Sequence, residues 1–194
     1  MSMAVYGMIA MLLGTKYLIR CIMRTDSFND LSLAMLYYGL LPLIVAPSAL
    51  LYAALPILVL VVRSTWRDWV VAVASMLFPL AAVCYWNWCA GNGFLTPAEN
   101  IYQTILTPSE FSLFSTLNPA SVLLLGVILL MILCSISLII SDKYSLKVKS
   151  RAIMRFNSLL LIATISMLLM PSSTATTFAI IATPAAMLIP LIFV

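Results

Sequence analysis

The longest uncharged apolar segment, residues 31–62, most constrains what this chain can fold into. As one straight helix, its 32 residues would measure about 48 Å, whereas the hydrocarbon core of a bilayer is about 30 Å thick. Pro42 and Pro47 interrupt the segment, and proline inside a helix removes a backbone hydrogen bond and clashes with the preceding turn. The segment therefore predicts either a broken, re-entrant hairpin that turns through residues 42–49 or two short spans joined by a turn.

Composition assigns the chain to the membrane class. Of the 194 residues, 64% are hydrophobic and 8% are charged, too few charges to cover the surface of a soluble globule. We expect a single transmembrane domain over residues 1–194. Its predicted fold is all-α, a polytopic transmembrane helical bundle with five to six crossings, a proline-broken hairpin and short interfacial helices. Besides residues 31–62, the apolar runs are Met3–Met23, Val70–Ala90, Ala120–Ser141, Phe156–Met170 and Phe178–Val194.

The positions of the basic residues predict a topology. All ten Lys and Arg residues lie in segments 16–30, 63–68 and 142–155, and none lies in segments 91–119 or 171–177. Because cytoplasmic loops are enriched in Lys and Arg, the first three segments are predicted to be cytoplasmic and the other two extracytoplasmic. Residues 31–62 must then enter and leave the membrane on the same side, which favours the hairpin independently of its prolines.

Aromatic residues mark both ends of the run Val70–Ala90, as in the aromatic belts at membrane interfaces. Trp66 and Trp69 precede the run at the predicted cytoplasmic interface, and aromatic residues at 85, 86 and 88 end it at the opposite surface. Loop 91–119 contains two Thr-Pro-x-Glu sequences, which begin at Thr96 and Thr107. Each predicts a capping box, in which the Thr and Glu side chains bond the backbone N–H groups of the other residue, followed by a short interfacial helix.

No catalytic or metal-binding pattern is present in the sequence. The chain has no histidine, and its four cysteines (21, 84, 89 and 134) form no C-x-x-C pair, so neither a metal nor a cofactor is expected. Glu99 and Glu110, the acidic residues predicted on the outer side, are already explained as capping residues. We therefore assign no catalytic residue.

The candidate binding residues are basic. Lys16, Arg20 and Arg24 recur every four residues and form one row on a helix, and Arg63 and Arg67 precede the third run. Lys16, Arg20, Arg63 and Arg67 are candidates for binding a lipid phosphate. The alternative interpretation is that these long side chains extend to the headgroups without binding a specific lipid.

The order of these parts resembles a known superfamily. A proline-broken hairpin (LSLAMLYYGLLPLIVAPSALLYAALPILVLVV) is followed by RSTWRDW, by LFPLAAVCYWNW and, later, by DKYSLKVKSRAIMRFNSLLLIATISMLLMPSSTATTF. Residues 5–190 are similar to the central membrane region of the C-type glycosyltransferases, which use polyprenyl-phosphate sugars. They resemble more closely an uncharacterised family of bacterial multi-pass inner-membrane proteins. The resemblance implies an inner-membrane location.

This sequence departs from the two groups that it resembles in two respects. The acidic catalytic residue of C-type glycosyltransferases precedes the matched region, so no residue here takes that role. Relatives in the uncharacterised family carry further spans before the position of Met1, so we expect a shortened member or a partial sequence.

These observations lead to three functional hypotheses. The first is a non-catalytic membrane subunit or scaffold that packs with other membrane proteins or with a second copy of the chain. Its partners would also include membrane lipids but no nucleic acid. The alternative is a glycosyltransferase-like protein, or a remnant of one, with a cavity for a polyprenyl phosphate lipid. A small-solute transporter is the third, although no inverted repeat is visible.

Overall fold

The predicted all-α class is confirmed for the described part of the chain. The computed structural model describes residues 2–24, 28–62, 65–107 and 148–188, with Gly126 and Ser137 as isolated positions. Within these ranges it contains seven α-helices, two short 3-10 helices and no strand. The elements are α1 (Ser2–Met23), α2 (Phe28–Ile44), η1 (Ala46–Ala49), α3 (Leu50–Val62), α4 (Trp66–Cys89), α5 (Thr96–Leu106), α8 (Val148–Ser166), η2 (Met167–Leu169) and α9 (Ala175–Leu188).

Two of the described helices, α1 and α4, are long and apolar enough to cross a membrane. They coincide with the predicted runs Met3–Met23 and Val70–Ala90. Helix α8 begins at Val148, inside the segment 142–155 that was expected to be a loop, because this basic segment contains no helix-breaking residue. Apart from Gly126 and Ser137, the predicted span Ala120–Ser141 lies outside the described residues.

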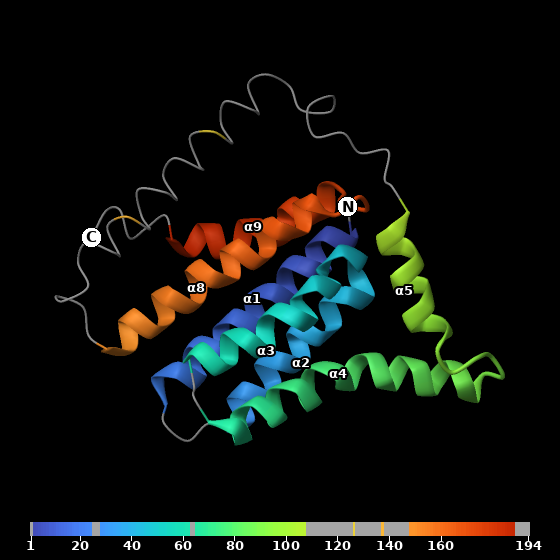
Figure 1. Cartoon of the computed structure of the whole chain (residues 1–194), viewed down its shortest axis with the longest axis horizontal. Helices are drawn as coiled ribbons and strands as arrows, with labels where there is room; N and C mark the ends of the chain where they lie inside the picture. The colour runs from blue at the N-terminus through green and yellow to red at the C-terminus, as the bar shows by residue number, and fades with distance from the viewer. Residues whose placement is uncertain are drawn as a thin grey trace.

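The apolar segment 31–62 forms two helices that run in opposite directions (Figure 1). Helix α2 continues through Pro42, which differs from the predicted break at that residue, and the chain turns at Val45, whose backbone is extended (φ −134°, ψ 101°). Pro47 lies at the start of η1. The Ser48 hydroxyl donates to the Val45 carbonyl (2.7 Å), and the Tyr52 hydroxyl donates to the Gly39 carbonyl (2.8 Å). The turn thus lies within the predicted range 42–49, after Pro42.

Helix α2 lies between α1 and α4 and packs tightly against both. A Cβ atom at Gly39 would overlap the backbone carbonyl of Met76 in α4, and one at Gly14 in α1 would lie 3.0 Å from the Tyr38 ring. Glycine at these two positions therefore allows the close approach of the helices. The Ser75 hydroxyl also donates to Ser32 across the α2–α4 contact (2.9 Å).

Helices α8 and α9 complete the bundle. Both contact α1, and α8 also contacts α3 (Figure 1). The Asn157 side chain of α8 donates to the Pro184 carbonyl of α9 (3.0 Å), which fixes these two helices to each other. The described parts of the predicted runs Phe156–Met170 and Phe178–Val194 thus pack side by side over α1.

A tight corner joins α4 to α5. Gly91 has a positive φ of 84°, and the side chains of Asn87 and Thr96 both donate to the Gly93 carbonyl. The predicted capping box at Thr96 is therefore wrong: the N-cap is Leu95, and the Thr96 hydroxyl bonds backward to the corner instead of accepting from Glu99. The helix predicted after Thr96 is present as α5. Thr107, the first residue of the second predicted cap, ends α5 and its hydroxyl donates to the Thr104 carbonyl (2.9 Å), whereas residues 108–119, with the rest of that motif, lie outside the described part.

Candidate functional site

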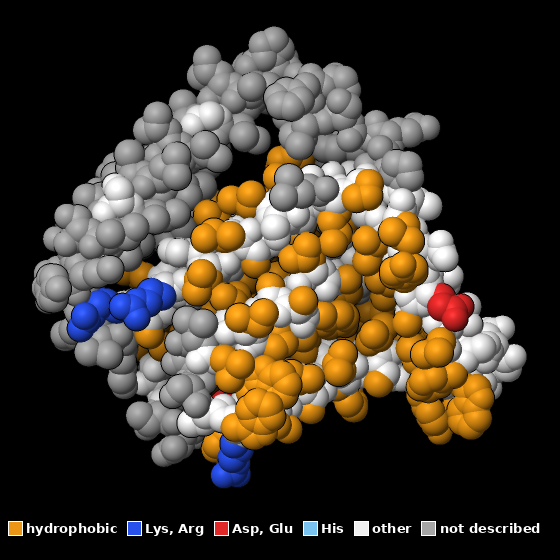
Figure 2. All heavy atoms as spheres, in the orientation of Figure 1, with side chains coloured by type: hydrophobic (Ala, Val, Ile, Leu, Met, Phe, Trp, Pro, Cys, Tyr) orange, Lys and Arg blue, Asp and Glu red, His pale blue; other side chains and the backbone are white. Residues whose placement is uncertain are grey.

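The two ends of the helical bundle differ chemically. At one end, which we call the basic end, helices α1, α3 and α9 finish and helices α2, α4 and α8 begin (Figure 1). The opposite, tip end holds the start of α1 and the turn at Val45. A Cβ at Gly7 would lie 3.7 Å from side-chain atoms of both Val45 and Ile180, which places α1, the turn and α9 together there. Figure 2 shows Lys and Arg side chains where α4 and α8 begin.

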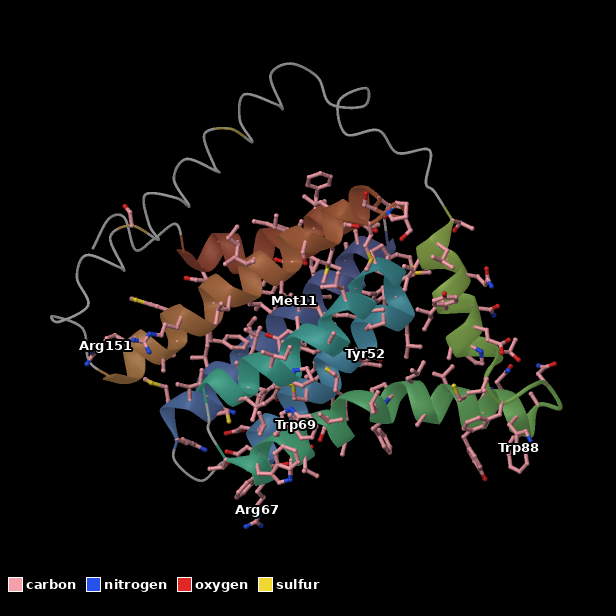
Figure 3. All side chains as sticks on the ribbon, in the orientation of Figure 1. Met11, Tyr52, Arg67, Trp69, Trp88 and Arg151 are labelled. Atoms are coloured by element: carbon pink, nitrogen blue, oxygen red, sulfur yellow. The ribbon has the colours of Figure 1, made fainter. Side chains whose placement is uncertain are left out.

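The described members of the predicted phosphate-binding set lie on two helices, α1 and α4. Lys16 and Arg20 are exposed on α1. Arg67 is exposed at the start of α4, where its guanidinium lies 4.6 Å from the centre of the Phe28 ring (Figure 3). Arg63 lies outside the described residues. The described members of the set therefore share the basic half of the molecule but not a common pocket.

A cavity of about 350 Å³ lies among α1, α8 and α9 toward the basic end. Its described lining residues come from three helices, two from α1, five from α8 and one from α9. These residues are Thr15, Ile19, Ser150, Ile153, Met154, Phe156, Asn157 and Met187.

Two polar side chains of the lining are already bonded within the protein. The Thr15 hydroxyl lies 3.0 Å from the Met11 carbonyl and 2.9 Å from the Leu12 carbonyl. Asn157 uses its amide for the Pro184 carbonyl. With these groups engaged, the cavity presents mainly hydrocarbon and sulfur to a ligand, as most small-molecule sites do.

Basic residues flank the cavity without lining it. Arg151 follows Ser150 directly and lies one turn before Met154, so it borders the α8 wall (Figure 3). Its Nε atom is buried and has no hydrogen-bond partner among the described residues. Lys16 has the same relation to Ile19 on α1.

A second candidate surface is the outer side of α4. Only 22% of its most apolar window is buried, and its exposed side chains are large and apolar. Figure 2 shows this apolar surface extending toward the α4–α5 corner. The exposed large residues of α4 are Trp66, Val70, Leu77, Phe78, Val83, Tyr85, Trp86 and Trp88.

Sequence reasoning did not find the cavity. Ser150, Met154 and Asn157 have the i, i+4, i+7 spacing of one helix face, and Thr15 and Ile19 have the spacing of another. That spacing is visible in the sequence, but it does not reveal that the two faces meet.

Among the described residues, no group of three or more His, Cys, Asp or Glu residues could hold a metal ion. Comparisons with protein families, with curated proteins and with solved structures found no match to this chain.

Proposed function

We propose that this chain is a multi-pass protein of the bacterial inner membrane, with five to six crossings, and that it acts as a non-catalytic subunit. In this proposal, its outer α4 surface contacts a partner membrane protein or a second copy of the chain. The observation that carries the proposal is α4 itself, an apolar helix of 24 residues whose large side chains mostly point away from the bundle.

The dimensions of α4 support a membrane location. Trp66 and Trp86 are 20 positions apart, which corresponds to about 30 Å along a helix, the thickness of the hydrocarbon core. Trp66 stacks on Trp69 at one end, and Tyr85 lies against Trp88 at the other. Aromatic side chains are favoured at the two interfaces of a membrane because their rings are apolar and their N–H and O–H groups are polar.

The grouping of charges at the basic end supports the predicted topology. The described cations at the start of α4 and α8 and at the end of α1 would face the cytoplasm, and α5 would lie at the outer interface. In this arrangement α2 and α3 enter and leave on the cytoplasmic side. Single-cysteine variants Glu99→Cys and Lys147→Cys should react with an impermeant maleimide from opposite sides of the membrane, and labelling of both from one side would overturn the topology.

Photo-crosslinking in native membranes tests the subunit role. Benzoylphenylalanine replaces Phe78 on α4, which is 62% exposed, and, as the matched control, Tyr6 on α1, which is 61% exposed. We expect a discrete adduct at position 78, with the mass of one defined membrane protein or of a second copy, and none at position 6. Adducts with lipid alone at both positions would contradict the proposal.

A second candidate function is glycosyltransferase-like binding of a polyprenyl phosphate. The cavity among α1, α8 and α9 favours it, because Lys16 and Arg20 lie on one of the helices that line the cavity. Under this hypothesis, mass spectrometry of the purified protein detects a bound prenyl lipid, and the paired variant Lys16→Ala/Arg20→Ala reduces its amount. Absence of any prenyl lipid would exclude it.

A further inference from the structure

We infer that the cavity among α1, α8 and α9 binds the acyl chain of one fatty acid or lysophospholipid, whose anionic headgroup pairs with Arg151. This inference rests on the proposed membrane location but not on the proposed partner contact at α4. It differs from the second candidate function in the ligand, a fatty acid or lysophospholipid in place of a polyprenyl phosphate.

The walls of the cavity favour a hydrocarbon chain. Ile19, Ile153, Met154, Phe156 and Met187 supply the apolar lining. Methionine side chains adapt their shape to a ligand chain, and neither methionine nor isoleucine offers it a hydrogen bond. The Thr15 and Asn157 side chains are already bonded to backbone carbonyls. A ligand with several polar groups would leave those groups unpaired along this surface.

The size of the cavity favours one chain. Its volume of about 350 Å³ is near the lower limit of small-molecule sites, which hold roughly 300–1,000 Å³. From Ser150 to Asn157 it extends seven positions along α8, or about 10 Å. A two-chain phospholipid would need a wider cavity.

The charges beside the cavity favour an anionic headgroup. Helices α1 and α8 contain no acidic residue, so the cations on them have no neutralising partner on their own helix. Arg151 borders the lining residues Ser150 and Met154, and its Nε atom is buried without a hydrogen-bond partner in the described part of the chain. A phosphate or carboxylate at this position would supply the acceptor that a buried guanidinium N–H requires.

The test is native mass spectrometry of the detergent-solubilised full chain with lysophosphatidylglycerol. We expect one retained lipid per chain. Ile153→Trp fills the cavity and should weaken retention by at least about tenfold, whereas Ile162→Trp, the same change at a position on α8 that is 59% exposed, should leave it unchanged. Equal retention by the two variants would overturn the inference, since it would indicate non-specific lipid on the surface.

Further measurements test the headgroup and the hydrocarbon chain of the ligand separately. A monoacylglycerol with the same chain has neither a phosphate nor a carboxylate and should be retained more weakly, and Arg151→Gln should reduce the difference between the two lipids. Equal retention of both lipids by the unmodified chain would overturn the assignment to Arg151. Glycerol 3-phosphate should not displace the lipid, and displacement by it would overturn the hydrocarbon-chain site. If Ile153→Trp loses helical circular dichroism, Met187→Phe narrows the cavity from α9 and carries the same expectation.

Discussion

Helices α1 and α4 are similar in length and composition, but they occupy different environments. Both are long and apolar enough to cross a membrane, yet 39% of the most apolar window of α1 is buried inside the molecule against 22% for α4. Helix α1 contacts α2, α8 and α9, whereas α4 contacts α2, α3 and α5 and leaves most of its length uncovered. Apolar composition therefore predicts that a helix avoids water, but not whether protein or lipid surrounds it.

The largest expected effect comes from disrupting the contact between α2 and α4, which fixes α4 to the bundle. Gly39→Leu would place side-chain atoms where the Met76 carbonyl lies, and a backbone carbonyl in a helix cannot move aside as a side chain can. We expect the free energy of unfolding, measured by denaturant titration in detergent, to fall by more than about 4 kcal/mol. Gly7→Ala is the control, because a Cβ there makes contacts of ordinary length (3.7 Å). Equal effects of the two changes would contradict the close α2–α4 packing.

Truncation of one side chain on each helix compares their environments directly. Met11 in α1 is fully buried, so Met11→Ala leaves a cavity and should lower the free energy of unfolding by about 2–4 kcal/mol (Figure 3). Phe78→Ala in α4 removes an exposed side chain and should change it by less than about 0.5 kcal/mol. A large loss from Phe78→Ala in the purified single chain would show that α4 is more buried than this structure indicates.

One hydrogen bond within the α2–α3 hairpin should make a smaller contribution to the free energy of unfolding. Tyr52→Phe removes the hydroxyl that donates to the Gly39 carbonyl (Figure 3). We expect a loss of about 0.5–1.5 kcal/mol in the same titration. Tyr102→Phe, at an exposed position on α5, serves as the control and should have no effect. If both variants unfold like the parent, this hydrogen bond does not stabilise the turn.

The smallest expected effect concerns Arg67 at the start of α4. Arg67→Ala removes the cation above the Phe28 ring and should lower stability by about 0.5–1 kcal/mol. Arg67→Lys retains a cation and should recover part of the loss. Failure of lysine to improve on alanine would argue that the guanidinium stabilises through packing and not through its charge.

Much of the fold was predictable because it depends on local chemistry. The turn within residues 42–49 follows from two prolines in an apolar run too long for one span, and the helices at Met3–Met23 and Val70–Ala90 follow from their apolar composition. The capping prediction at Thr96 failed because the corner at Gly93 competes for the same hydroxyl. Such a competing acceptor depends on the path of the chain, which a four-residue motif does not specify.

The sequence by itself determined the helical class, the place of the hairpin turn and the separation of basic segments from segments without Lys or Arg. These depend on residue types and on spacing along the chain. Only the tertiary structure decided that α1 is more covered than α4, and that faces of α1, α8 and α9 line a cavity beside Arg151. In a chain that is 64% hydrophobic, nearly every helix face is apolar, so hydropathy does not distinguish the faces that meet; steric fit, as at Gly39 against Met76, does.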